Sequence, residues 1–135
     1  SLDELAFLAE QDHLPGEHAA DIERAARSLW HENLQLMALT LGRHGCGMLT
    51  EKEFISCPGF QVHALDSTGA GDGFTAGLLT GVLQQGLAEG ADLSRSTVEA
   101  LGRYANAVGA LTTTQQGVVP ALPHSAEVQA FLADG

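Results

Sequence analysis

A glycine-rich segment in the middle of the chain carries the residues best suited to chemistry. It reads Asp66-Ser-Thr-Gly-Ala-Gly-Asp-Gly-Phe74 and joins a predicted strand to a predicted helix. Gly69 and Gly71 can adopt backbone conformations that are closed to other residues, and small residues let a ligand approach the backbone. The helix that follows begins with unpaired N–H groups and the positive end of its dipole. The segment therefore predicts an anion site suited to phosphate, built from Gly69, Ala70 and Gly71.

Asp72 stands out in this segment because a carboxylate repels phosphate, so a site that only bound phosphate would have no use for it. Beside a backbone anion site, a carboxylate can act as the general base that takes the proton from an attacking hydroxyl. Acidic side chains are also common in the first turn of any helix, where they favour the dipole. The residues alone therefore leave two interpretations open, a phosphate-transfer site and a plain capped turn.

Other phosphate-binding motifs and several functional classes are excluded by the sequence. It contains no GxxxxGK[ST] P-loop, and the dinucleotide motif GxGxxG fails because Phe74 stands at its last glycine. A net charge of -11 argues against binding to nucleic acid and against docking on an anionic membrane. No apolar run is long enough for a transmembrane helix. An acidic protein can still transfer phosphate, because backbone N–H groups can form its anion site.

The cysteines and histidines give no metal motif. Cys46 and Cys57 are too few for a disulfide framework or a zinc site, and free thiols in a reducing cytosol are the favoured interpretation. One disulfide between them stays open. The six histidines show no HExxH pattern or close pair, which indicates surface positions.

Hydrophobic periodicity predicts how these residues are held. Capping boxes are expected at Ser1–Glu4 and Ser96–Glu99, each opening a helix. A stripe of apolar side chains after the glycine-rich segment is expected to face inward, with Gly77 and Gly81 allowing close helix packing. Its members are Phe74, Leu78, Leu79, Val82 and Leu83. Further helices are expected at 17–31 and 125–133, strands at 36–41, 46–50, 54–57 and 62–65, and a turn-rich loop at 112–117. The alternation predicts a three-layer α/β domain with a mostly parallel sheet.

The glycine-rich segment resembles the C-terminal signature of PfkB-type carbohydrate kinases, D-[ST]-T-G-A-G-D-x-F. Other segments extend the resemblance from about residue 36 to the end. Thr40–Gly45 is similar to the T-L-G-x-x-G turn of this family. Tyr104–Ala107 and Gly117–Pro123 resemble its A-N-A-x-x-A-L helix and the G-x-x-x-A-L-P segment that follows. The chain as a whole resembles the second half of such kinases.

The resemblance implies a ribokinase-like fold and ATP-dependent phosphorylation of a sugar hydroxyl, with Asp72 as the catalytic base. It places Gly69, Ala70 and Gly71 around the γ-phosphate, Gly42 and Gly45 in the nucleotide-side turn, and Asn106 in the adenine pocket. Mg²⁺ is expected to arrive with ATP. Many relatives bind a monovalent cation, usually K⁺, beside the anion hole. The corresponding positions here are Asp66, Thr68, Thr112, Gln115, Gly117 and Ala121.

The resemblance also implies a domain organisation. Residues 1–135 are expected to form a single domain, the nucleotide-binding and catalytic part, without the N-terminal sugar-binding half and its lid. The acceptor is expected to be a small-molecule sugar, in the manner of fructokinase or 2-keto-3-deoxygluconate kinase, and the location the cytoplasm. A homodimer stays open. Two alternatives remain, a truncated nucleotide-binding module without catalysis and a kinase for a nucleoside or vitamin precursor.

Overall fold

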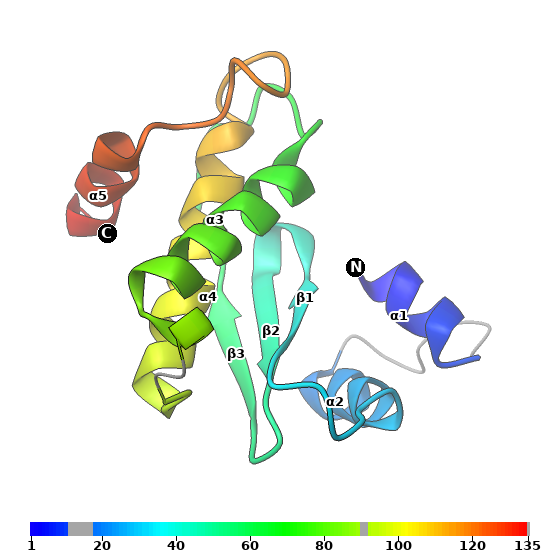
Figure 1. The fold of residues 1–135 in the computed structure, drawn as a ribbon. Coiled ribbons are helices and arrows are strands. Elements are labelled where there is room, and N and C mark those ends of the chain that lie inside the picture. Colours follow the sequence, from blue (N-terminus) through cyan, green and yellow to red (C-terminus); the bar gives the residue numbers. More distant parts are fainter. Residues whose placement is uncertain (11–17, 90–91, 135) are drawn as a thin grey trace.

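Helices cover both faces of a small β-sheet in the computed structural model of the chain, which describes residues 1–10, 18–89 and 92–134 (Figure 1). The strands are β1 (Met37–Thr40), β2 (Gly45–Leu49) and β3 (Phe54–Pro58). The α-helices are α1 (Leu2–Leu8), α2 (Ala19–Ser28), α3 (Ala70–Gln84), α4 (Arg95–Thr112) and α5 (Ser125–Asp134), with short 3₁₀ turns η1 (Gly42–His44) and η2 (Leu87–Glu89). Helices α1 and α2 contact one side of the sheet, α4 contacts the other, and α3 packs on α4. This layered arrangement confirms the α/β class.

The three strands are antiparallel in the order β1-β2-β3. The predicted hairpin is confirmed, with Cys46 opposite Cys57 and Leu49 opposite Phe54. The expectation of a mostly parallel sheet is wrong for the described residues. The reason is the short connections, because a few residues can only reverse the chain, whereas parallel neighbours need a long crossover.

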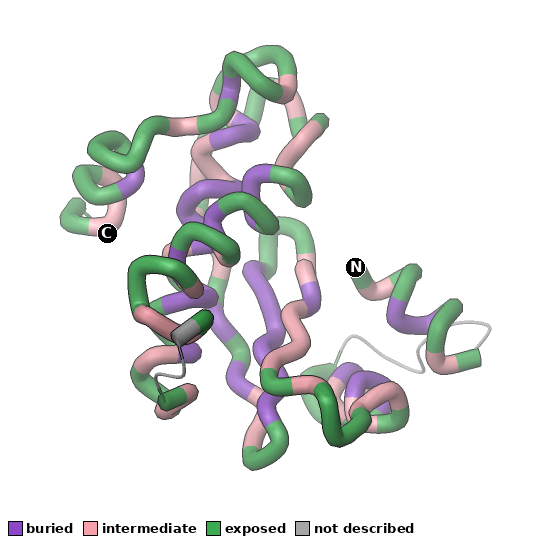
Figure 2. Tube along the Cα trace, in the orientation of Figure 1, coloured by how far each residue is buried: buried purple, intermediate pink, exposed green. Residues whose placement is uncertain are grey.

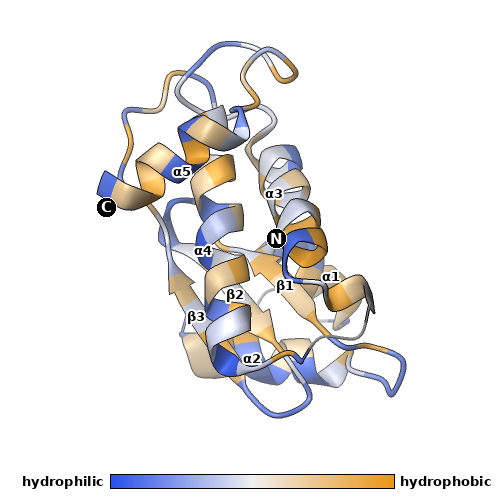
Figure 3. Cartoon of the chain, turned by 60° about the vertical axis from the view of Figure 1, so that its left-hand side comes forward, coloured by the Kyte–Doolittle hydropathy of each residue, from blue (hydrophilic) through white to orange (hydrophobic). Residues whose placement is uncertain are grey.

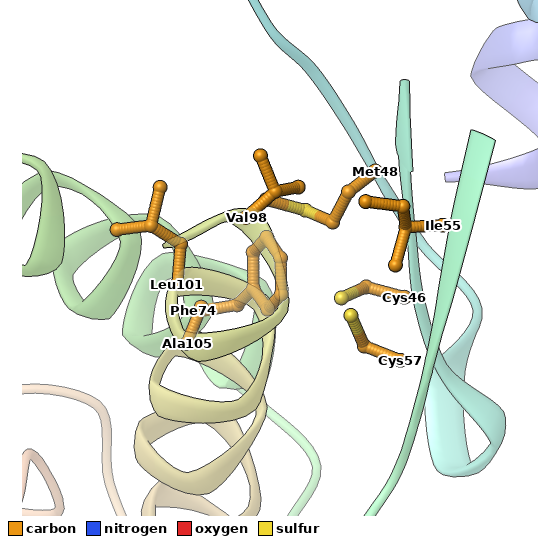
Figure 4. Close-up of a cluster of buried hydrophobic side chains, with 8 residues drawn as sticks. All are labelled: Cys46, Met48, Ile55, Cys57, Phe74, Val98, Leu101 and Ala105. Carbon is orange, nitrogen blue, oxygen red and sulfur yellow. The ribbon is translucent and has the colours of Figure 1, made fainter. Parts of the chain in front are cut away.

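Side chains alternate between the two faces of the sheet, as the pleat requires. Cys46 and Met48 point toward α3 and α4, where they join Ile55, Cys57 and Phe74 in one core cluster (Figure 4). Val98, Leu101 and Ala105 complete this cluster. Leu39 and Leu49 lie in a second cluster with residues of α1 and α2. The strands β1 and β2 are correspondingly apolar along most of their length (Figure 3).

Helices α3 and α4 cross closely because α3 turns glycines toward α4. A Cβ added at Gly77 would lie 2.9 Å from Cβ of Val108, and one at Gly81 would lie 2.8 Å from Cδ2 of Leu101. The predicted inward stripe is therefore wrong in part. Phe74 is buried, but Leu79 and Leu83 are 59% and 71% exposed. Buried and exposed stretches alternate along the helices that pack on the sheet (Figure 2).

Several element boundaries differ from the sequence-based expectations. The capping box at Ser1 is confirmed, whereas the second helix of this type begins at Arg95 with Ser94 as its N-cap rather than at Ser96. The structure has no strand at 62–65, where the N–H of Leu65 instead donates to the carbonyl of Thr113 at 2.8 Å. The helix expected at 17–31 covers only Ala19–Ser28, and position 17 lies outside the described residues.

The last helix and the loop before it agree with their predictions, since α4 ends at Thr112 and α5 starts at Ser125. Among the helices that the structure describes, none combines the length and the apolar character that crossing a membrane requires.

Candidate functional site

The start of α3 presents free backbone donors. Its N-cap, Gly69, has φ of +81°, a left-handed conformation that favours glycine, and a Cβ there would lie 2.7 Å from Cγ1 of Val118. The N–H of Ala70 donates to the carbonyl of Ser67 at 3.2 Å. The N–H groups of Gly71 and Asp72 have no hydrogen-bond partner within the described parts of the chain. Two unpaired donors at the positive end of a 15-residue helix can bind an anion.

Asp72 lies in the first turn of α3 and is exposed. Its carboxylate does not cap the helix, because α3 has no side-chain hydrogen bond at its N-terminus. In the first turn the carboxylate favours the helix dipole, so a plain helix start and a general base both stay open as interpretations of Asp72. An exposed carboxylate beside free N–H groups is available to a molecule that arrives from solvent.

A cavity of about 660 Å³ lies between the start of α3, the middle of α4 and the η1 turn. It brings together five of the predicted site residues. These are Gly42 and Gly45 of the turn, Ala70 and Gly71 of the anion site, and Asn106 of α4. Asp72 does not line the cavity and follows the lining residue Gly71 in the chain. Its exposed side chain therefore belongs to the same helix turn as the cavity-lining residues Ala70 and Gly71.

The side chain of Asn106 is fixed by the end of β3. It is 7% exposed, and its Nδ2 donates to the carbonyls of Cys57 and Pro58, both at 3.1 Å. Both hydrogens of the amide nitrogen are therefore used. No donor to Oδ1 occurs among the residues that the structure describes, so the oxygen is the atom that Asn106 can offer to a ligand in the cavity.

The predicted nucleotide-side turn is built on two glycines with positive φ, Gly42 at +58° and Gly45 at +99°. A Cβ at Gly45 would lie 2.1 Å from the carbonyl oxygen of Cys57 and 2.4 Å from the nitrogen of Gly59, whereas Gly42 has open space around it. Of these two glycines, only Gly45 is packed tightly against the end of β3. Arg43, between them, also lines the cavity.

Three of the six predicted cation-binding positions lie together. The N–H of Thr68 donates to Oδ1 of Asp66 at 2.9 Å. Hydrogen bonds from the Thr68 side chain and backbone lower the pKa of Asp66, and the Gly117 backbone contributes in the same direction. The donor type fits a hard cation, because carboxylate, hydroxyl and carbonyl oxygens are what such ions prefer.

The other three positions are not joined to this group by any described contact. The Thr112 side chain is fully buried, and its hydroxyl donates its hydrogen to the carbonyl of Val108 at 2.8 Å. Gln115 is exposed and Ala121 is buried. No cluster of three or more His, Cys, Asp or Glu side chains suited to a metal occurs in residues 1–10, 18–89 and 92–134.

The sequence interpretation missed one wall of the cavity, made of Phe60, Val62 and Ala64. These residues alternate in the chain, and that spacing could have placed their side chains on one side of an extended segment. Phe60 is supported from behind by α5, since its ring centroid lies 4.9 Å from that of Phe131, and by the Arg103 guanidinium at 5.2 Å. The Phe60 ring is therefore held between α5 and Arg103.

Comparison with known proteins identifies the family of the chain. Residues 1–125 match the pfkB family of carbohydrate kinases. A probable fructokinase-3 of Arabidopsis thaliana is 41% identical over 132 residues, which cover 97% of this chain and 35% of that protein. The chain thus spans about a third of the length of this relative.

Solved structures are similar in fold and in sequence. Fructokinase of Vibrio cholerae with bound fructose, ADP and calcium has a TM-score of 0.75 at 31% identity, over 97% of this chain and 39% of that one. A double-mutant form of the same enzyme holds fructose, ADP and potassium, with a TM-score of 0.75 at 32% identity over 97% of this chain and 38% of that one. Aminoimidazole riboside kinase of Salmonella enterica, with its riboside and an ATP analogue, has a TM-score of 0.74 at 28% identity over 98% and 40%. From the extent of the family match and the shared fold, this chain belongs to the pfkB family of carbohydrate kinases.

Proposed function

We propose that the polypeptide carrying this chain transfers the γ-phosphoryl group of ATP to a hydroxyl group of a sugar. The observation that supports this most directly is the exposed carboxylate of Asp72 in the same helix turn as the unpaired N–H groups of Gly71 and Asp72 itself, next to the cavity-lining residue Gly71. Backbone donors can stabilise charge on a phosphoryl group, and a carboxylate can accept the proton of an attacking alcohol. Neither feature alone would suggest transfer.

In this proposal the nucleotide occupies the cavity and the acceptor arrives from the open side of α3. The Asp72 carboxylate takes the proton of the acceptor hydroxyl as its oxygen bonds to the γ-phosphorus, and the bond from that phosphorus to ADP breaks. The N–H groups at the start of α3 stabilise the charge that develops on the phosphoryl oxygens. The Gly42–Gly45 turn and Asn106 hold the nucleotide, with Oδ1 of Asn106 turned to the base.

Two ions belong to the proposal. Mg²⁺ would neutralise charge on the phosphates of ATP and would be held largely by those phosphates and by water. A monovalent cation such as K⁺ would lie at Asp66, Thr68 and Gly117, with Thr112, Gln115 and Ala121 as the remaining positions, where it would add positive charge behind the anion site. The relatives in the solved structures hold calcium or potassium together with ADP.

Fructose is the acceptor that the relatives favour, because the sequence matches and the Vibrio cholerae structures are fructokinases. 2-Keto-3-deoxygluconate and a nucleoside are the alternatives, and the Salmonella enterica relative holds a riboside. The residues that select the acceptor are proposed to lie in a further part of the polypeptide, with residues 1–135 as the nucleotide-binding and catalytic domain. The cytoplasm is the proposed location, and a homodimer the proposed assembly.

The test is replacement of Asp72 by Asn in the full-length polypeptide. Loss of a general base is expected to lower kcat by a factor of roughly 10² to 10⁴ while ATP binding is retained. The matched control is Asp21→Asn, which removes another carboxylate from the first turn of a helix, α2, away from the cavity. ADP release is measured with a panel of fructose, 2-keto-3-deoxygluconate and a nucleoside.

An Asp72→Asn enzyme with full turnover would overturn the role of Asp72. If the unmodified polypeptide bound ATP but released no ADP with any acceptor, the alternative of a non-catalytic nucleotide-binding module would replace the kinase. Turnover with the nucleoside alone would retain the mechanism and change the substrate class.

A further inference from the structure

Cys46 and Cys57 face each other across neighbouring strands, outside the site described above. They are direct partners in the β2–β3 register, and their sulfur atoms point toward one another in the core (Figure 4). Both are free thiols, 0% and 4% exposed. We propose that this pair is an oxidative modification site, at which a peroxide converts the two thiols to a reversible disulfide between β2 and β3.

The backbone spacing permits that bond. The N–H of Gly59 donates to the carbonyl of His44, and the N–H of Thr50 donates to that of Glu53, so hydrogen-bonded pairs alternate along the hairpin. Cys46 lies two residues from His44 and four from Thr50, which places Cys46 and Cys57 in a hydrogen-bonded pair. Cα atoms in such pairs are about 5.5 Å apart, inside the range of roughly 4.4 to 6.8 Å that disulfides span. Only the Cβ atoms must approach, by about 1 to 2 Å.

Helix α4 leaves space for the two sulfur atoms by having a glycine above them. A Cβ at Gly102 would lie 2.5 Å from Sγ of Cys57 and 3.3 Å from Sγ of Cys46. Sγ of Cys46 lies 3.9 Å from the carbonyl oxygen of Gly102. Both thiols therefore share one compartment between the hairpin and α4, and no other side chain separates them.

The pair is chemically unequal, with Cys57 the better nucleophile. A hydrogen bond from the Cys46 thiol lowers the pKa of Cys57, against the opposing effect of burial. The thiolate of Cys57 attacks the peroxide, an S–O bond forms, the O–O bond breaks, and the leaving oxygen departs as water. Cys46 then attacks the sulfur of the sulfenic acid, the S–S bond forms and a second water leaves. Two thiols lose two hydrogens and one peroxide becomes two waters. β3 is an edge of the described sheet, where local opening admits a small oxidant.

Formation of the disulfide is expected to affect the cavity through Asn106, which lines the cavity and contacts Cys57. Asn106 holds the carbonyls of Cys57 and Pro58, and Gly45 touches the same Cys57 carbonyl from the turn. Drawing Cys57 toward Cys46 would shift these contacts and weaken nucleotide binding. This consequence rests on the proposed function, whereas formation of the disulfide does not.

The test uses the reduced, folded, full-length polypeptide, treated with hydrogen peroxide and then blocked with N-ethylmaleimide. Trypsin cleaves between the two cysteines at Lys52, so they fall in the separate peptides 44–52 and 53–95. The expected product is these two peptides joined with loss of two hydrogens, and separated again by dithiothreitol. Cys46→Ser should abolish the joined product and leave a sulfenic acid on Cys57 that dimedone traps. Recovery of both cysteines as alkylated thiols, or a bond formed only in urea-unfolded protein, would overturn the proposal.

A second measurement separates the disulfide from its effect on the site. ATP affinity is compared before and after oxidation by direct binding, which does not depend on turnover, and is expected to fall by roughly fivefold or more. Cys57→Ser, treated with peroxide in the same way, should keep its affinity. A joined peptide with unchanged ATP affinity would retain the modification site and reject its coupling to the cavity.

Discussion

Gly69 and Val118 meet where the loop after α4 crosses the start of α3. A Cβ at position 69 would lie 2.7 Å from Cγ1 and 3.3 Å from Cβ of Val118, and the backbone there has φ of +81°. The segment that follows α4 thus lies directly against Gly69, the first residue of the proposed anion site. Both conditions require glycine, one because of the neighbouring side chain and the other because of the backbone.

Gly69→Ala is therefore expected to lower the free energy of unfolding by about 1 to 3 kcal/mol, the cost of strain at a left-handed residue. Kinase turnover should fall with it, because the N–H groups of the anion site would be displaced. Urea unfolding and ADP release measure the two effects. Gly71→Ala is the matched control for stability, since a Cβ there meets nothing within 4 Å. It should keep or slightly raise stability but weaken ATP binding, because Gly71 lines the cavity. A Gly69→Ala protein as stable as the wild type would contradict this account.

Gly77→Ala tests the close crossing of α3 and α4. Its methyl group would lie 2.9 Å from Cβ and Cγ2 of Val108 and 3.0 Å from Cα of Ala105, atoms that cannot turn away. Overpacking costs about 1 to 3 kcal/mol, and the higher helix propensity of alanine returns about 1 kcal/mol at most. Thermal unfolding should show a net loss. Gly71→Ala adds the same methyl to the same helix in open space, so equal melting temperatures for the two variants would refute the steric explanation.

Asn106→Leu keeps the approximate size of the side chain and removes its donors. Two carbonyls, of Cys57 and Pro58, would lose their partner, which should lower the free energy of unfolding by about 1 to 3 kcal/mol. KM for ATP should also rise, because the end of β3 supports the glycine turn. The exposed Asn33→Leu is the control and should change stability by no more than about 0.5 kcal/mol. A rise in KM with unchanged stability would show a contact to the nucleotide without the structural role.

Asp66 gives a prediction for pH. Hydrogen bonds from Thr68 lower its pKa in the folded protein, so the charged form is favoured by folding. Its contribution to stability is present above the pKa of the unfolded chain and is lost as pH falls through the lower pKa of the folded state. Wild type should therefore be more stable than Asp66→Asn at neutral pH, and the difference should vanish in acid. Denaturant unfolding measured from neutral to acid pH checks this, and a constant difference would exclude the carboxylate as its source.

Turns and helix starts could be predicted from the sequence where a residue type, such as glycine, favours one local backbone conformation. Gly69 and Gly71 before a helix-like segment predicted a helix start, and α3 begins at Ala70 with Gly69 as its N-cap. The hairpin around Glu51–Glu53 followed from alternation and a polar turn. The class of the domain follows from the same alternation of elements. These predictions depend on neighbours in the chain.

The rest could not be predicted because it depends on residues distant in sequence. Leu79 and Leu83 fit an apolar stripe, but α4 packs on the glycine side of α3, where the backbones approach more closely. Ser94 and Ser96 are both residue types that cap helices well. In the structure Ser94 is the N-cap, because its hydroxyl oxygen accepts a hydrogen bond from the N–H of Thr97. The segment at 62–65 has strand-like residues but no strand beside it among those described, and its last N–H bonds to α4 instead. The two hydrogen bonds that the Asn106 amide donates to the carbonyls of Cys57 and Pro58 likewise depend on the packing of β3 against α4, which the sequence does not reveal.

Two residues that line the cavity come from α4 and its C-cap, Asn106 in the helix and Thr113 just past its last turn. They are seven positions apart, which corresponds to a rise of about 10 Å along a helix axis. One residue inserted between them would turn Asn106 by roughly 100° relative to Thr113 and lengthen the gap by about 1.5 Å. Chain length is therefore constrained inside this helix, and homologous chains can be expected to place their insertions and deletions before Ser94 or after Thr114, with none between.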